Sequence, residues 1–588
     1  MTSPKTNPLA EYSSYTYQIT WYICTPEQYN GFVNQGRVAK TGDIVVQSGG
    51  VGADESRAAG FKYDYYIENT KLKTVLGGKV STSIELSFDV IEPMGFSFVH
   101  DLKIAAGAVR GKSSLPGVSK INNAAKHFNV LGIRFLGYDA NGTPQPPKYE
   151  TFYDFQITEF KFKIDGKATV YHITAAVISE TSAMGQIEGR VVGNMSIKGE
   201  KVSDVVNDLI AKLNKEQELL LLPKTGEDPK AEFISTYLPV DWSKANGIED
   251  SKMTENPDLD KSTTHGHEVK EVGQSNPKYE QKTSPNFKDK MIQFKDGTSI
   301  VQVLEGIIGN SAWFWDRHNQ QVKTRPLADP TARPGKRYQD IRVTAKAEAK
   351  AYDKKRGMWV YNYTFAVHAY DVEALRNTFI TDSGEWPGPH KKYEYWFTGK
   401  NTEVLKYEHT MDNMYFLTLP GVSDNDDPKD VTKATTLRTN EVRQLGQGTS
   451  AEIRNASHRQ MIDIGSNAES KLLIYGDPDY LMNNPDPGGS TSDYQSDGQT
   501  INGSSGFVYI DISFREAIDY TPTGYLELSD DFVLWEQNYP GAIRYIVISI
   551  DSTLARGNFT QELTLAVATF EKYAPPTKNK NETTLADE

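Results

Sequence analysis

The chain has 588 residues and a formal net charge of −13, with 64 Lys and Arg against 77 Asp and Glu. This balance disfavours nucleic-acid binding as the main task, because attraction to phosphates needs clustered basic side chains. Ordinary solubility explains the charge, and a negative wall would also suit a channel through which DNA slides without sticking. The single cysteine, Cys24, excludes an intrachain disulfide. No apolar run approaches the roughly 20 residues of a spanning helix, so we expect no membrane partner.

The length predicts more than one domain, and the first, over residues 1–195, is rich in β-strand patterns. Tyrosine is abundant, with 32 copies, and it suits half-buried strand faces and subunit interfaces. The clearest hairpin is predicted over Phe155–Val177, where apolar residues alternate and Asp165-Gly166 supplies an I′-type turn. Pro93 and Gly95 end another alternating strand, and a short helix is predicted over Phe98–Ala106.

Residues 196–340 are predicted to form a mixed helical region. Apolar residues recur on one stripe between residues 200 and 215, which predicts an amphipathic helix. A second helix is predicted over Ser299–Gly309, with a capping box at its start and Gly309-Asn310 at its end. Between the helices, residues 246–290 hold few large apolar side chains and are predicted to be a polar surface insertion.

Strand patterns return over residues 341–575, interrupted by a polar insertion at 421–470 and followed by a flexible tail at 576–588. The last hairpin is predicted over Ile543–Val567. It resembles the hairpin at 155–177, GNFTQELTLAV against GKATVYHITAAV, which suggests two related β-barrel domains. The alternative, that any two hairpins with a glycine turn look this alike, stays open.

Motifs that would carry chemistry are absent or misplaced. Ala106–Ser113, AGAVRGKS, fits a relaxed phosphate-loop pattern, but a predicted helix precedes it and Pro116 follows it, so we expect Lys112 to bind no nucleotide. His265 and His267 lack further ligands at the usual metal spacing. Two acidic stretches lack the glycine and the final glutamate of a calcium loop; they contain Asn256, Asp258 and Asp260, and Asp424, Asp426 and Asp427. We therefore predict no catalytic, cofactor or metal residues, no cofactor, and a protein that is not an enzyme.

The most informative stretch is Tyr393–Asp412, YEYWFTGKNTEVLKYEHTMD, where an alternating aromatic strand meets a tight polar turn. It resembles a segment of tailed-bacteriophage baseplate hub proteins, in which an aromatic strand runs into TGKN and then V-L. Three other islands resemble the same family: Asn7-Pro8-Leu9 with Tyr12–Trp21, the IEP-x-G corner within Ser83–Asp101, and Gly476-Asp477-Pro478 after a strand. The candidate structural or interface residues are Tyr395, Phe397, Gly399, Lys400, Asn401, Leu405, Pro93, Gly95, Gly476, Asp477 and Pro478.

This resemblance implies a mostly β fold with some helix (α+β), made of two tube-like β-barrel domains, a small mixed middle region and polar insertions. It implies a structural virion protein, a homotrimeric baseplate or tail-tip hub, whose six quasi-equivalent barrels adapt a sixfold tail tube to a threefold central spike. The implied partners are the tail tube, central spike, tape measure and baseplate wedge or tail-tip proteins. DNA would pass through the channel without specific binding, and assembly would occur in the host cytoplasm.

Two alternatives remain open. The first is a tail-associated peptidoglycan hydrolase, which would need two carboxylates facing a sugar; no pattern in the sequence marks such a pair. The second is a receptor-binding tail protein.

Overall fold

A computed structural model describes the chain in segments separated by gaps. The described residues are 5–34, 42–76, 82–147, 149–177, 189–191, 195–222, 231–253, 291–294, 296–314, 339–371, 389–396, 401, 403–411, 468–482, 500–503, 508–520, 523–524, 526–529, 531–534, 537–540 and 543–567. Most of the two predicted insertions and the whole C-terminal tail lie outside these ranges. So do Phe397, Gly399 and Lys400, the two histidines at 265 and 267, and the two acidic stretches.

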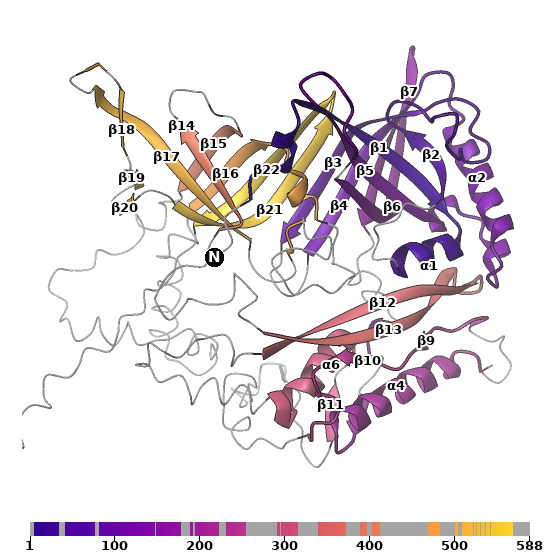
Figure 1. Ribbon diagram of the computed structural model, residues 1–588. Helices are drawn as coiled ribbons and strands as arrows, with labels where there is room; N and C mark the ends of the chain where they lie inside the picture. Colours follow the sequence, from indigo (N-terminus) through magenta and orange to yellow (C-terminus); the bar gives the residue numbers. More distant parts are fainter. Residues whose placement is uncertain are drawn as a thin grey trace, which may run out of the picture.

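The described chain is mostly β with some helix, as predicted, and its largest element is a 14-stranded sheet (Figure 1). Eight of its strands lie side by side in the order β15 (Val404–Met411), β16 (Ala468–Tyr475), β22 (Asn558–Val567), β21 (Ile543–Ala555), β3 (Tyr66–Leu76), β4 (Thr82–Glu92), β7 (Ala168–Val177) and β6 (Glu150–Asp165). The path continues through β5 (Phe128–Tyr138), β1 (Ser14–Cys24) and β2 (Asp43–Gln47). Beside it, β17 (Tyr509–Tyr520) pairs with β21, with β18 (Leu526–Ser529) and, in parallel, with β14 (Lys391–Trp396).

The eight strands divide into two units with the same strand order. In the first unit, the hairpins β3–β4 and β6–β7 lie in the order β3-β4-β7-β6, and in the second, β15–β16 and β21–β22 lie in the order β15-β16-β22-β21. The units meet where β21 pairs antiparallel with β3, from Ser549 opposite Val75 to Leu554 opposite Thr70. The β6–β7 and β21–β22 hairpins therefore occupy the same place in their units.

The turns of these two hairpins differ from the predicted alignment. Asp165 pairs with Ala168, so the turn residues are Gly166 and Lys167, one residue later than expected. In the other hairpin Ala555 pairs with Asn558, and the turn residues Arg556 and Gly557 both have positive φ, 52° and 81°. The glycine is first in one turn and second in the other, so the two sequences match only after a shift of one residue.

The first unit closes over an aromatic core that includes Trp21, which is fully buried. The Trp21 ring lies 5.6 Å from those of Phe88 and Phe155, at the steep angles that aromatic pairs favour. Helix α2 (Phe98–Lys112) contacts β1 and buries one stripe of apolar side chains, the last of which is Val109. Because this stripe continues past residue 106, α2 runs longer than predicted, and its final turns contain most of the phosphate-loop pattern.

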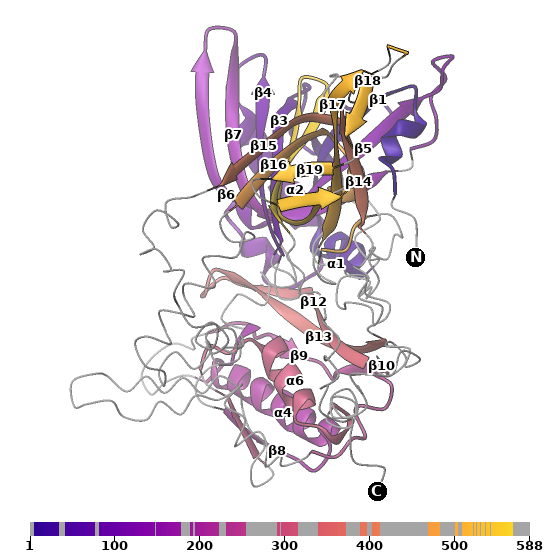
Figure 2. The same cartoon turned by 90° about the vertical axis from the view of Figure 1, so that its left-hand side faces the viewer.

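A second lobe lies below the large sheet in both views (Figures 1 and 2). It holds the two predicted helices, α4 (Val202–Leu219) and α6 (Ile300–Gly309), and the long hairpin of β12 (Gln339–Asp353) and β13 (Met358–Asp371). β13 pairs in parallel with β9 (Thr236–Tyr237) and β10 (Asp241–Lys244), while β8 (Met195–Lys198) pairs with β11 (Met291–Phe294).

Contacts of α1 (Pro26–Asn34) and of β13 join this lobe to the first unit. The Asn30 side-chain amide donates to the Ala349 carbonyl at 2.9 Å, and the Trp359 indole N–H donates to the Lys126 carbonyl at 2.7 Å. The remaining elements are short: β19 (Asp531–Leu534), β20 (Gln537–Pro540), and the 3-10 turns η1 (Pro8–Glu11), η2 (Val118–Lys120), η3 (Ala124–Lys126) and η7 (Pro478–Tyr480). Among the described residues, no helix combines the length and apolar character needed to cross a membrane.

Candidate functional site

Three of the four sequence islands meet at one corner of the second unit. The Asn7 side-chain amide donates to the Gly476 carbonyl at 3.1 Å, although the two residues lie 469 positions apart in the chain. The Asn7 side chain also accepts from the Leu9 backbone N–H at 2.9 Å and so caps η1. The Lys5 N–H donates to the carbonyl of His390, the residue before β14. The N-terminus, the Gly-Asp-Pro corner and the start of the aromatic strand therefore form one structure.

A buried charge cluster lies at the centre of this corner. The Lys391 Nζ lies 2.7 Å from Asp477 Oδ2 and 2.6 Å from Asp479 Oδ2, and it donates to the Thr6 carbonyl at 3.1 Å. The Lys391 and Asp477 side chains are each 2% exposed, and that of Asp479 is 4% exposed. Buried ions of this kind persist only when they are paired and hydrogen-bonded.

The Gly-Asp-Pro sequence is required by the local geometry. A Cβ at Gly476 would lie 2.1 Å from the ring of Phe559, so only glycine fits there. The Asp477 carboxylate accepts from the Asp479 backbone N–H at 2.9 Å and caps η7, whose first residue is Pro478. The Asp477 N–H donates to the side chain of Gln561 at 2.8 Å, which fixes the corner against β22.

Burial controls the protonation of this cluster. It raises the pKa of Asp477 to about 6, and the Lys391 ammonium offsets only part of that effect. Burial disfavours the charged form of Lys391, but attraction to Asp477 and Asp479 is stronger and raises its pKa. Burial also raises the pKa of Glu403, a further carboxyl that the charge of Lys391 influences.

The IEP-x-G corner, with Pro93 and Gly95, is organised around Glu92, which is 2% exposed. The Glu92 carboxylate accepts from the backbone N–H groups of Ser97 at 2.8 Å and Phe98 at 3.1 Å, where the N-terminus of α2 favours a negative charge. Gly95 has φ of 115°, a conformation that favours glycine.

The two corners are equivalent in the two units. Each follows the second strand of its unit, and each places a buried acid directly before a proline. Glu92 accepts from the Tyr171 hydroxyl at 2.7 Å, and Asp477 is held through Gln561. Tyr171 and Gln561 each lie four residues after the second turn residue of their hairpins. The side chain at the same hairpin position therefore makes a hydrogen bond to the corner in both units.

The turn between β14 and β15 is described only in part. The Asn401 side chain accepts from the Trp396 N–H at 2.6 Å and donates to the Trp396 carbonyl at 3.2 Å. Tyr395 packs near Phe514, with ring centroids 6.1 Å apart. Leu405 is 40% exposed and lies where the β15–β16 register shifts.

Asn401→Ala is expected to lower the free energy of unfolding by about 1–3 kcal/mol, because it removes both hydrogen bonds to the Trp396 backbone. Urea denaturation of the purified chain measures this change. Asn401→Asp keeps the hydrogen-bond acceptor but not the donor, so its free energy of unfolding should lie between those of Asn401→Ala and the unchanged chain. An alanine variant as stable as the unchanged chain would contradict the role given to this side chain.

The sequence pattern points to Asp477 but not to Lys391 or Asp479. One signal was available for Lys391: it precedes Tyr393 by two residues, so it shares the buried face of β14. A lysine on the buried face of a strand needs an acidic partner. Nothing in the local pattern indicates that the partner lies near residue 477.

The exposed face of the large sheet is a mixed-charge surface. Lys471 lies 3.8 Å from Glu562, and His172 Nδ1 lies 2.6 Å from Asp89. Lys73 stands opposite Asp551 on one neighbouring strand and Glu85 on the other. Acidic and basic side chains are therefore mixed on this face.

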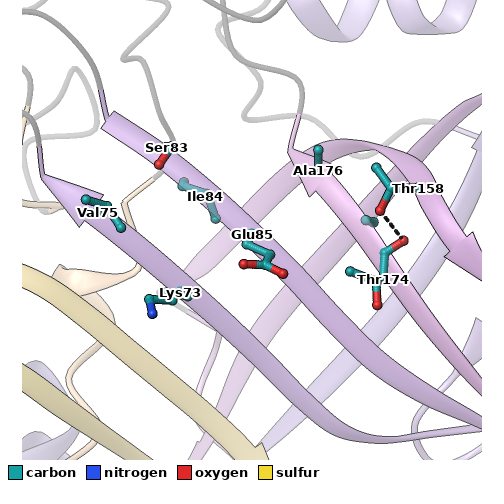
Figure 3. A pocket seen from close by; sticks show the side chains of 9 residues that line it. Lys73, Val75, Ser83, Ile84, Glu85, Thr158, Thr174 and Ala176 are labelled. Carbon is teal, nitrogen blue, oxygen red and sulfur yellow. Dashed lines mark hydrogen bonds between the residues drawn. The ribbon is translucent and has the colours of Figure 1, made fainter.

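An open depression of about 370 Å³ lies on this face between β3, β4, β6 and β7 (Figure 3). Its lining residues are Lys73, Val75, Ser83, Ile84, Glu85, Thr158, Thr174, Ala175 and Ala176. The Thr158 hydroxyl donates to the Thr174 carbonyl at 3.0 Å. Among the described residues, no cluster of His, Cys, Asp and Glu could hold a metal ion.

No family model and no curated protein matches the chain. Solved structures do resemble it. A tail protein from Neisseria meningitidis MC58 is 8% identical, with 94% of this chain and 96% of that chain covered and a TM-score of 0.28. The 43 kDa tail protein of prophage MuSo2 from Shewanella oneidensis is 9% identical, covering 86% and 96%, with a TM-score of 0.27.

A third similar structure is the E. coli c3393 protein, described as a component of the type VI secretion system with structural similarity to T4 bacteriophage tail proteins gp27 and gp5. It is 8% identical, covers 88% of this chain and 78% of its own, and has a TM-score of 0.24.

Proposed function

We propose that this chain is a structural phage tail protein, a baseplate or tail-tip hub that assembles as a ring of three copies around the genome-delivery channel. The observation that carries the proposal is the repeated strand order of the two units and their junction through β21 and β3. A repeat that joins its own next copy edge to edge forms a ring when the rotation between copies closes, and an open filament when it does not.

The open edges of the described sheet fit this continuation. The second unit presents β21 to β3 of the first unit. The equivalent of β21 in the first unit is β6, which pairs with β7 over residues 155–165 and with β5 only over residues 150–155. The equivalent of β3 in the second unit is β15, which ends the strand path. Pairing of β6 with β15 of a neighbouring copy would repeat the internal junction and cover two exposed edges.

Side chains at the internal junction indicate what the neighbouring copy would cover. Leu554 and Phe559, beside the tip of the β21–β22 hairpin, belong to the core of the first unit, and Phe559 lies 5.2 Å from the ring of Phe135. At the equivalent tip of the β6–β7 hairpin, Phe162 is 59% exposed and Ile164 is 58% exposed. Exposed aromatic and branched side chains at a free strand edge are typical of a subunit interface.

Three copies with two units each would give six units, which matches a sixfold tail tube on one side and a threefold spike on the other. The central spike, the tail tube, the tape measure protein and wedge or tail-tip proteins are the proposed neighbours in the virion. A mixed-charge sheet face suits passing DNA, because it offers no basic stripe for phosphates. The role proposed is structural, with no reaction of its own on a substrate.

The mass of the chain in solution tests the proposal. Sedimentation velocity is expected to give a species of three times 65.7 kDa, and negative-stain averages are expected to show a ring of six lobes. A chain that stays monomeric at tens of micromolar would contradict the ring. Clearing of purified cell walls would favour the hydrolase instead, and binding to whole cells by the isolated chain would favour a receptor-binding protein.

A further inference from the structure

The buried cluster of Lys391, Asp477 and Asp479 contains an amine and a carboxyl group in direct contact, with a second carboxyl group against the amine. We propose that Lys391 Nζ and Asp477 Cγ become joined by an intramolecular isopeptide bond, with Asp479 as the group that transfers the proton. The two contacts of Nζ, 2.7 Å to Asp477 Oδ2 and 2.6 Å to Asp479 Oδ2, place all three groups within reach of one another.

The charges in the cluster favour the reactive protonation state. One ammonium faces two carboxylates at positions that are at most 4% exposed, so the fully ionised cluster would bury an excess negative charge. Uptake of one proton removes that excess, and burial raises the pKa of Asp477 accordingly. A protonated carboxyl group is the electrophile that an amine can attack, whereas a carboxylate is not.

Each group then has a defined part in the step. The Asp479 carboxylate accepts a proton from Lys391 Nζ, and the free amine attacks Asp477 Cγ. The Asp479 backbone N–H, 2.9 Å from Asp477 Oδ1, stabilises the charge that develops on that oxygen. Asp479 then returns the proton to Oδ2, which leaves as water, and takes the second proton from the nitrogen, so that a neutral amide and a protonated Asp479 remain. One N–C bond forms, one C–O bond breaks, and one water molecule is released without any oxidant or cofactor.

The surroundings suit such a condensation. Tyr393 and Tyr480 lie nearby and are almost fully buried, and the Tyr393 hydroxyl donates to that of Tyr480 at 3.0 Å. Exclusion of bulk water lowers the cost of forming a neutral amine, and fixed contact replaces a bimolecular encounter. The product would tie β14 covalently to the corner after β16, and so would close a loop that includes β15.

Mass spectrometry of the intact, denatured chain tests the proposal. The chain is expected to be lighter than its sequence mass by one water molecule, and fragmentation should locate the loss to a branched peptide that joins Lys391 to Asp477. Dehydration of an aspartate to a succinimide cannot account for a loss at this site, because Pro478 has no backbone N–H to attack the Asp477 carboxyl group. A chain at its full sequence mass, or trypsin cleavage after Lys391, would overturn the proposal.

Two variants separate the bond from the ion pair. Asp479→Asn keeps the Lys391–Asp477 contact but removes the proton transfer, so it is expected to have its full sequence mass while staying folded. Lys391→Arg keeps the positive charge without a nucleophilic amine and is also expected to have its full mass. A linked peptide in Asp479→Asn would overturn the role given to Asp479.

Discussion

Lys391→Met is expected to lower the free energy of unfolding by about 3–5 kcal/mol, because it leaves two buried carboxyl groups without a cation. Urea denaturation followed by tyrosine and tryptophan fluorescence measures the loss. Lys406→Met is the matched control: it makes the same chemical change on β15, where Lys406 and Glu408 are paired but more than half exposed. The control should lose less than about 1 kcal/mol.

The loss in Lys391→Met should depend on pH. Burial raises the pKa of Asp477 to about 6, above its value of about 3.9 in the unfolded chain. The native state therefore binds more protons than the unfolded state between these values, and stability falls as the pH rises through them. In Lys391→Met no positive charge offsets the effect of burial on the pKa of Asp477. The variant should therefore lose less free energy of unfolding at pH 4 than at pH 8. Equal losses at both pH values, or a loss below about 1 kcal/mol, would contradict the prediction.

Phe162→Glu is expected to weaken the ring by about 30-fold or more while the monomer stays folded. An aromatic anchor at the centre of an interface is worth about 2 kcal/mol or more, and a glutamate would place an unpaired charge there. Sedimentation velocity over a range of concentrations measures association, and circular dichroism checks the fold.

Leu222→Glu provides the control for Phe162→Glu. Leu222 is also 59% exposed, but it lies beyond the end of α4 and away from the β6 edge. This variant should assemble as the unchanged chain does. If Phe162→Glu also sedimented unchanged, the proposed edge would be wrong.

Local periodicity predicted much of the fold. β7, β21 and β22 each bury one face, so their apolar residues alternate with polar ones. α4 and α6 bury one stripe each, at the spacing of a helix. Periodicity does not report which strand pairs with which, so the parallel pairing of β13 with β9 and β10 could not be predicted.

The site shows the same division. Gly476, Asp477 and Pro478 stood out because a corner demands such residues, and the structure uses them for a close ring contact and a cap. The ion pair of Asp477 with Lys391 joins residues far apart in the chain, and so does the bond from Asn7 to Gly476. Contacts of this range depend on the whole fold, and no short window of sequence contains them.

The β21–β3 junction has a further consequence for the proposed ring. Because one chain carries both partners of this junction, it forms during folding, at an effective concentration that does not depend on how much protein is present. A ring of six separate units would lose translational and rotational freedom at every junction, whereas three chains lose it only at the junctions between copies. Because the two units are joined in one chain, the β21–β3 junction and the junction between copies can differ in strength. The closed ring can then form at low subunit concentration even when the junctions between copies are weak enough to rearrange.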